Sequence, residues 1–211
     1  MKAFFALLVT TLSSAIAAAA PGEVIFGGGV AFGTEIATPG LQLNGYYAFD
    51  RTSKLANLRL GFDIDGFLSN TDELAEGRLT KSWADFNLNG QYVVLAPKDR
   101  PFLIYGLAGV NFAFLGAKVE YFDGVNQRDR NDDAFKGGLN LGVGGEYALD
   151  VGEKSGPDFS LFGEAKYVVS NADQLVVVAG IRFALPLGGA PGAKPQAPVA
   201  AKPAEANPVS R

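Results

Sequence analysis

The chain of 211 residues carries a formal net charge of −4 and contains 27 glycines, 16 phenylalanines and 7 tyrosines, but no cysteine and no histidine. Its length suits one domain with a sizeable core, and its lack of cysteine and histidine excludes disulfides, thiolate or imidazole metal sites and histidine-dependent catalysis. No basic stripe accompanies the negative charge, which argues against a nucleic-acid partner. We therefore expect a protein that is not an enzyme, with no catalytic residue, no cofactor and no metal site.

The N-terminus has the three parts of a secretory signal peptide. Lys2 makes the start positive, residues 3–12 form an apolar run too short to cross a membrane as a helix, and small residues of the A-x-A type follow. Cleavage after Ala17 or Ala19 fits this pattern. We assign residues 1–19 to the signal peptide of an exported protein, with an N-terminal core helix as the alternative.

Residues 55–68, LANLRLGFDIDGFL, alternate between apolar and polar positions. Phe62 and Ile64 fall on one face, and Asp63 and Asp65 fall on the other, as in a β-strand with two unlike faces. Eight such runs follow one another, at about residues 23–33, 40–50, 55–68, 82–95, 102–119, 134–149, 158–170 and 174–185. This succession predicts an all-β fold, an antiparallel up-and-down barrel in which no strand edge is left free.

The breaks between the runs alternate in character. Short turns occupy 50–54, 96–101 and 150–158, whereas longer and more polar loops occupy 33–39, 69–81 and 120–133, and a very short break follows at 171–173. The fifth and sixth runs can also continue through Val119–Tyr121 as a hairpin beyond the barrel. Such a hairpin would offer a strand edge to a partner.

Two kinds of barrel fit this pattern, and the composition of the polar face separates them. A soluble lipocalin-like barrel has its apolar face inside, whereas an outer-membrane barrel has it outside, against lipid. A water-facing sheet carries many Lys and Glu residues, but this polar face consists mainly of Gly, Ala, Ser, Asn, Gln and Asp, with Lys166 almost its only central lysine. We predict a transmembrane barrel with a polar interior. The soluble binding barrel is the alternative, although the first strand lacks a lipocalin-like G-x-W.

Aromatic residues of the apolar face sort by height when the chain is threaded with its N-terminus in the periplasm. Two aromatic belts, one at each membrane interface, are typical of outer-membrane barrels. The periplasmic belt would contain Phe49, Tyr92, Phe102, Tyr147, Phe159 and Phe183, and the outer belt Phe32, Phe86, Phe112 and Tyr167.

Charged residues of the polar face predict an ion-pair network inside the barrel. Its members on one wall are Glu146, Glu164, Lys166 and Arg182, and those on the opposite wall are Arg59, Asp63, Asp65 and Asp85. The predicted role is to satisfy the buried charges and plug the barrel, because removing one partner would strand the other. A gated ion path through the same groups is the alternative.

The sequence resembles the small eight-stranded outer-membrane barrels, such as the OmpA transmembrane domain and OmpX. The resemblance rests on the signal peptide, the alternating runs, RPFLIYGLAGVNF at 100–112 and LVVVAGIRFAL at 175–185. It implies a barrel over residues 20–186 in the outer membrane of a Gram-negative bacterium. Residues 187–211 are rich in Pro and Ala and are expected to form a disordered periplasmic tail, like the hinge that follows the barrel in OmpA-type proteins.

The predicted function is structural or adhesion-like and non-enzymatic, with outer loops that contact host or matrix surfaces. Outer-membrane lipid would surround the barrel, Arg78 and Lys81 could meet lipopolysaccharide phosphates, and the tail could contact peptidoglycan. A small gated pore for ions or solutes is an alternative, although eight strands enclose no aqueous channel.

Overall fold

The computed structural model describes residues 22–50, 53–75, 77–97, 100–122, 127–149, 158–170 and 173–187. The expected signal peptide, the expected tail beyond residue 187 and residues 123–126 of the predicted loop at 120–133 lie outside the described residues. Within the described part, no helix is long and apolar enough to cross a membrane.

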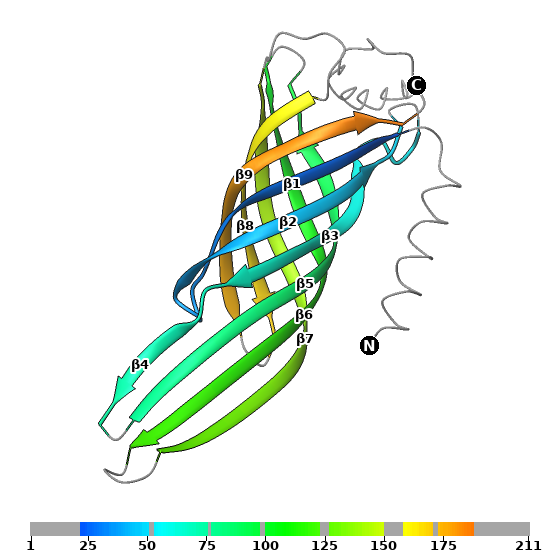
Figure 1. Ribbon diagram of the computed structural model, residues 1–211. Helices are drawn as coiled ribbons and strands as arrows, with labels where there is room; N and C mark the ends of the chain where they lie inside the picture. The colour runs from blue at the N-terminus through cyan, green and yellow to red at the C-terminus, as the bar shows by residue number, and fades with distance from the viewer. Residues whose placement is uncertain are drawn as a thin grey trace, which may run out of the picture.

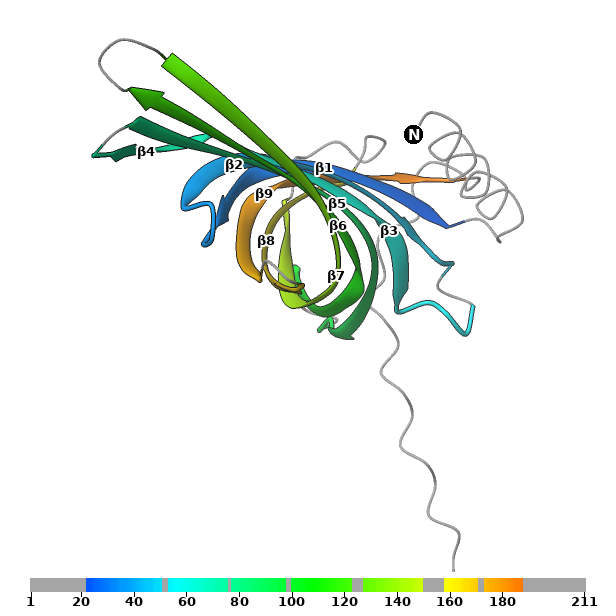
Figure 2. The same ribbon diagram turned by 90° about the horizontal axis from the view of Figure 1, so that it is seen from below.

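The described residues form nine strands in a single antiparallel sheet, of the order β3-β2-β1-β9-β8-β7-β6-β5-β4. The strands are β1 (Glu23–Gly33), β2 (Thr38–Ala48), β3 (Leu58–Phe67), β4 (Asn70–Leu74), β5 (Gly77–Leu95), β6 (Phe102–Phe122), β7 (Gln127–Leu149), β8 (Asp158–Val169) and β9 (Gln174–Pro186). A further pairing of β3 with β5 closes eight of them into a barrel and leaves β4 outside the ring (Figure 1; Figure 2). The prediction of an eight-stranded antiparallel barrel is confirmed.

The barrel is polar inside and apolar outside, as predicted. On β2, Leu41 and Leu43 are 69% and 64% exposed, whereas Gln42 and Asn44 are buried. Side chains of a strand alternate between its two faces, so this pattern places the amides in the lumen and the leucines on the outer surface.

The structure differs from the predicted strand bounds at two places. β2 ends at Ala48 rather than at residue 50, so Phe49 follows the strand. The predicted loop at 69–81 contains β4 and the first residues of β5, which are joined by polar cross-strand contacts: Thr71 with Thr80, Asp72 with Lys81 and Glu73 with Arg78. These contacts stabilise a hairpin in water without the apolar alternation that marks the barrel strands.

A sheet projects from one end of the barrel (Figure 1). β5, β6 and β7 have 19, 21 and 23 residues, whereas β8 has 12. We call β4, residues 77–83 of β5, 113–122 of β6 and 127–138 of β7 the projecting sheet. β8 pairs with β7 only over Leu139–Leu149, so within the described residues the outer part of β7 has a neighbouring strand only on its β6 side. The chain ends of the barrel meet at the opposite end, where Leu187 N donates to Gly22 O at 2.8 Å.

Gly144 marks a position in the barrel wall where a side chain has no room. A Cβ on this β7 residue would overlap the ring of Tyr105. Tyr105 is fully buried in the lumen and is hydrogen-bonded to Arg182 and Glu164, so its ring cannot move aside freely.

We expect Gly144→Ala to lower the free energy of unfolding by about 1–3 kcal/mol, the usual cost of overpacking. Gly106→Ala is the matched control, because no atom lies within 4 Å of a Cβ built there. Urea unfolding of both variants in detergent micelles measures the difference. Equal losses of stability would contradict the packing argument.

Candidate functional site

Arg182 of β9 is the centre of one charged cluster in the lumen. Its Nη1 lies 2.6 Å from Glu146 Oε1, and its Nη2 lies 3.4 Å from Glu164 Oε2. Its Nε donates to Asn44 Oδ1 at 3.2 Å. Arg59 Nη1 lies 2.6 Å from the same Glu146 oxygen, so this carboxylate joins two guanidinium groups that come from β3 and β9.

Three aromatic rings enclose the Arg182 guanidinium. The ring centroids of Phe162, Tyr46 and Tyr105 lie 4.1, 5.1 and 5.6 Å from its Cζ. The Tyr105 hydroxyl also accepts a hydrogen bond from Arg182 at 2.9 Å and donates one to Glu164 at 3.0 Å. Rings stabilise a desolvated cation by about 2 kcal/mol, so the guanidinium is held by aromatic faces as well as by carboxylates.

Lys166 of β8 is the centre of the second cluster. Its Nζ lies 2.7 Å from Asp65 Oδ2 and 3.4 Å from Asp63 Oδ2, and all three side chains are fully buried. The two carboxylates also accept hydrogen bonds from Gln42 and Asn87 (to Asp65) and from Tyr46 and Asn89 (to Asp63). The charges are therefore both paired and hydrogen-bonded, which burial requires of them.

Amide side chains extend the network around the wall. Asn140 Nδ2 of β7 lies 2.8 Å from Asn87 Oδ1 and 3.0 Å from Asn89 Oδ1 on β5, and Asn111 of β6 donates to Asn87 at 2.8 Å. An amide carries both donors and an acceptor, so these side chains connect neighbours inside a narrow lumen without adding charge.

The interior becomes apolar toward the projecting sheet. Asp85 lies buried in the lumen, but within the described residues it forms no ion pair and instead accepts a hydrogen bond from Trp83 Nε1 at 2.8 Å. Trp83 belongs to an apolar cluster that also contains Ala31, Ile36, Phe67, Ala113, Phe162, Val176 and Val178. Ile36 lies in the β1–β2 turn, so this cluster closes the lumen at the end that carries the projecting sheet.

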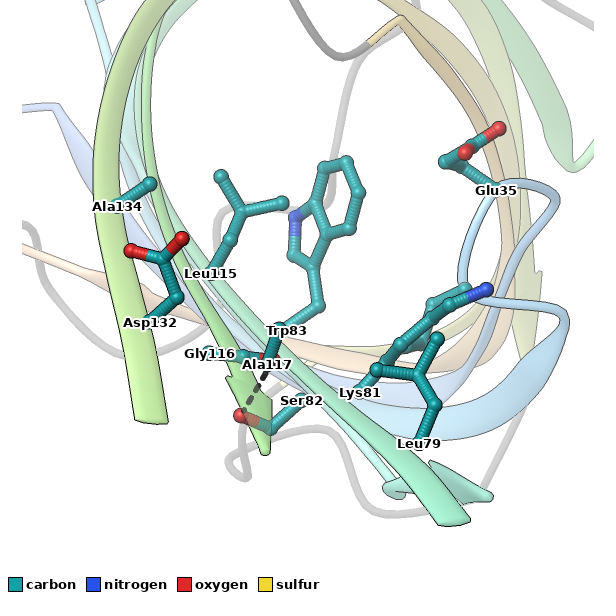
Figure 3. A pocket seen from close by; sticks show the side chains of 11 residues that line it. Glu35, Leu79, Lys81, Ser82, Trp83, Leu115, Gly116, Ala117, Asp132 and Ala134 are labelled. Carbon is teal, nitrogen blue, oxygen red and sulfur yellow. Dashed lines mark hydrogen bonds between the residues drawn. The ribbon is translucent and has the colours of Figure 1, made fainter. Parts of the chain in front are cut away.

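A cavity of about 330 Å³ lies beside the apolar cluster, where the projecting sheet leaves the barrel. Its lining comes from the β1–β2 turn and from β5, β6 and β7 (Figure 3). The Trp83 indole stands in its middle, between Leu115 and Ala134 on one side and Lys81 and Glu35 on the other. Ligand pockets range from about 300 to 1,000 Å³, so the cavity suits a group of limited size.

The structure sorts the predicted lumen residues into these groups. It brings Arg59, Glu146, Glu164 and Arg182 into one cluster and Asp63, Asp65 and Lys166 into the other, and it leaves Asp85 outside both.

Sequence reasoning missed Tyr105, Phe162 and Trp83 as lumen residues. Their signal was positional, because Phe162 shares the strand face of Glu164, and Trp83 shares that of Asp85.

The predicted belt residues lie at the outer surface or at the strand ends. Tyr92, Tyr147, Phe32 and Tyr167 are exposed, Phe102 lies opposite Tyr147 in register, and Phe49 contacts Tyr47 edge-on. Rings also follow one another across strands, with Phe26 and Phe159 against Phe183, and with Phe62, Phe86, Phe112 and Phe135 in one row. Phe26, Phe62 and Phe135 thus contact residues that were predicted for the belts.

We expect Lys166→Met to lower the free energy of unfolding by about 3–5 kcal/mol, because it strands the buried carboxylates of Asp63 and Asp65. Lys81→Met is the matched control. Its ion pair with Asp72 is exposed, and such a pair contributes less than about 1 kcal/mol. Urea unfolding in detergent micelles measures both variants, and similar losses would show that the lumen pairs are not essential to the barrel.

Comparisons with known proteins bear on the fold. No protein-family model matches the sequence, and no curated protein matches it. Among solved structures, a major outer membrane protein from Thermus thermophilus has a TM-score of 0.51 at 14% identity, covering 78% of this chain and 99% of that chain.

Two further solved structures have lower TM-scores. Ail, the attachment invasion locus protein of Yersinia pestis, gives 0.49 at 11% identity, over 79% of this chain and 99% of that chain. The N-terminal β-barrel domain of Pseudomonas aeruginosa OprF gives 0.37 at 12% identity, over 78% of this chain and 97% of that chain. The closed ring of eight antiparallel strands, with its polar interior, is the fold of the small outer-membrane β-barrels.

Proposed function

We propose that this protein is a non-enzymatic barrel of a Gram-negative outer membrane, whose projecting sheet contacts partners at the cell surface. The observation that carries the proposal is the reversed polarity of the barrel. Its outer surface exposes large apolar side chains on all eight strands of the ring, whereas charged and amide groups are buried inside. Such a surface is unfavourable in water and favourable in a bilayer.

The barrel strands have the length that a membrane requires. β1, β2, β3, β8 and β9 have 10 to 13 residues, and a tilted strand crosses the hydrocarbon core with about 9–11 residues. A soluble lipocalin-like barrel would need the opposite arrangement, with its apolar face around a ligand.

The projecting sheet supports the surface role. Outer-membrane barrels have short periplasmic turns and longer extracellular segments, so we place the chain ends in the periplasm and the projecting sheet outside. Its outer part of β7 has an unoccupied edge within the described residues, and an exposed edge can accept a strand from a partner.

Lipopolysaccharide contact through Arg78 and Lys81 receives less support, because Glu73 and Asp72 already neutralise these cations. Peptidoglycan contact through the tail concerns residues outside the described part. An ion path also receives less support, since the charged clusters and the apolar cluster both fill the lumen.

The lipid-facing surface can be tested with one arginine at two depths of β9. Ile181 is outward-facing near the middle of the strand, and Leu175 is outward-facing near its outer end. We expect Ile181→Arg to cost about 2–4 kcal/mol in lipid vesicles, and Leu175→Arg about 0–1 kcal/mol. Urea unfolding in phosphatidylcholine vesicles gives both values. Equal costs would mean that this face does not lie against hydrocarbon.

The surface role can be tested by shortening the projecting sheet. Ala113 and Lys136 are paired in register, so residues 114–135, which include Asp132 and Ala134 of the unoccupied edge, can be replaced by an Asn-Gly turn that keeps the hairpin closed. We expect a non-adherent Gram-negative host that displays the intact chain to adhere to epithelial cells or matrix, and the shortened variant to lose most of that adhesion. A variant that ends at Leu187 is the control, because it keeps the sheet intact. Unchanged adhesion of the shortened variant at equal surface expression would count against the proposal.

A further inference from the structure

Side chains on the inner side of the projecting sheet form rows across its strands. Trp83, Leu115 and Ala134 are paired in register across β5, β6 and β7, and so form one apolar row. The next row outward consists of Lys81, Ala117 and Asp132 in the same way. Both rows line the cavity (Figure 3), and both end at the unoccupied edge of β7.

The apolar row leaves a space at its end. Trp83 donates its indole N–H to Asp85, so it presents carbon to the cavity, beside buried Ile36 and partly buried Leu115. Ala134 is small, and the position beyond it in the row is empty within the described residues. A large apolar side chain from a strand laid beside β7 would lean over Ala134 toward Leu115, since neighbouring strands lie about 4.8 Å apart.

Charges flank this space along the β7 edge. Asp132 and Lys136 lie two residues to either side of Ala134, on the same face of the strand. Neither forms an ion pair within the described part of the chain, whereas Lys81 is already paired with Asp72. Glu35, in the β1–β2 turn, adds a carboxylate across the cavity.

We propose that the cavity and the β7 edge together bind an extended peptide segment of a surface partner, with an apolar side chain in the cavity. In antiparallel pairing, the orientation of every strand pair in this sheet, residues opposite Lys136, Ala134 and Asp132 follow one another at every second position. The segment therefore reads acidic, any, apolar, any, basic. Opposite charges directly across a strand pair stabilise it, and like charges destabilise it. This inference rests on the proposed surface role and names the chemistry of the partner.

Trp83 provides the readout, because the chain has a single tryptophan. The probe is a capped peptide without tryptophan, TVETFTKVT, titrated into the purified full chain in detergent micelles. We expect a saturable change in Trp83 emission. Replacing the central Phe of the peptide by Ala should weaken binding about tenfold to a hundredfold, the effect of losing one buried aromatic side chain.

Two control peptides test the register. TVKTFTEVT exchanges the charges, and TVETTFKVT moves the Phe to the opposite face of the strand. Both should bind at least about tenfold more weakly than the probe, since like charges across an interface and an unburied anchor each cost affinity. Equal binding of either control, or no saturable binding of the probe, would overturn the inference.

A matched pair of protein variants locates the site. Asp132→Lys faces the cavity and should weaken binding of the probe about tenfold. Asp133→Lys lies on the other face of the same strand and should leave binding unchanged. Equal effects of the two variants would overturn the assignment. Because these measurements use purified protein, loss of peptide binding with intact cell adhesion defeats this inference alone, whereas peptide binding without adhesion defeats the surface role alone.

Discussion

The fold depends on pairing the buried cations with carboxylates inside a lumen that has no room for bulk water. Eight strands enclose a space just wide enough for side chains, so a buried cation must find its carboxylates across the barrel. Lys166 does so with Asp63 and Asp65, and Arg182 with Glu146 and Glu164. A register shift of one residue would turn these groups outward and put leucines in their place. The network therefore fixes the strand register as well as filling the lumen.

The interior consists of two parts along the barrel axis, one polar and one apolar. Ion pairs and amides occupy the part nearer the chain ends, where they join strands that are distant in sequence, such as β3 and β7 through Arg59 and Glu146. The apolar cluster around Trp83 and Phe67 closes the other end. The polar part fixes which side chains face inward. The apolar part closes the barrel mouth and forms the bottom of the cavity.

Much of this arrangement could be predicted because a strand has a period of two. Alternation placed Asp63, Glu164 and Arg182 on one face, and the scarcity of lysine there identified that face as the interior. Choice of partner could not be predicted, since it depends on tilt and stagger, which bring Arg59 to Glu146 and leave Asp85 with Trp83. β4 was missed because its stabilising contacts are polar on both faces, and Tyr105 because an aromatic residue at a lumen position resembles one at a lipid-facing position.

The projecting sheet continues the barrel strands, but its inner face carries apolar residues where the inner face of the barrel carries polar ones. On the barrel side of Trp83 the inward positions of β5 are polar, from Asp85 to Gln91, whereas on the side of the projecting sheet they include Leu79. The barrel part exposes an apolar outer surface, which lipid would cover in the proposed membrane location. Beyond the barrel mouth no wall lies opposite the inner face of β5, β6 and β7 within the described residues. The apolar side chains of this face therefore line a cavity open to solvent. An exposed apolar hollow beside an unoccupied strand edge costs stability and invites association, and the charges of Asp132 and Lys136 on that edge restrict which strand can join it.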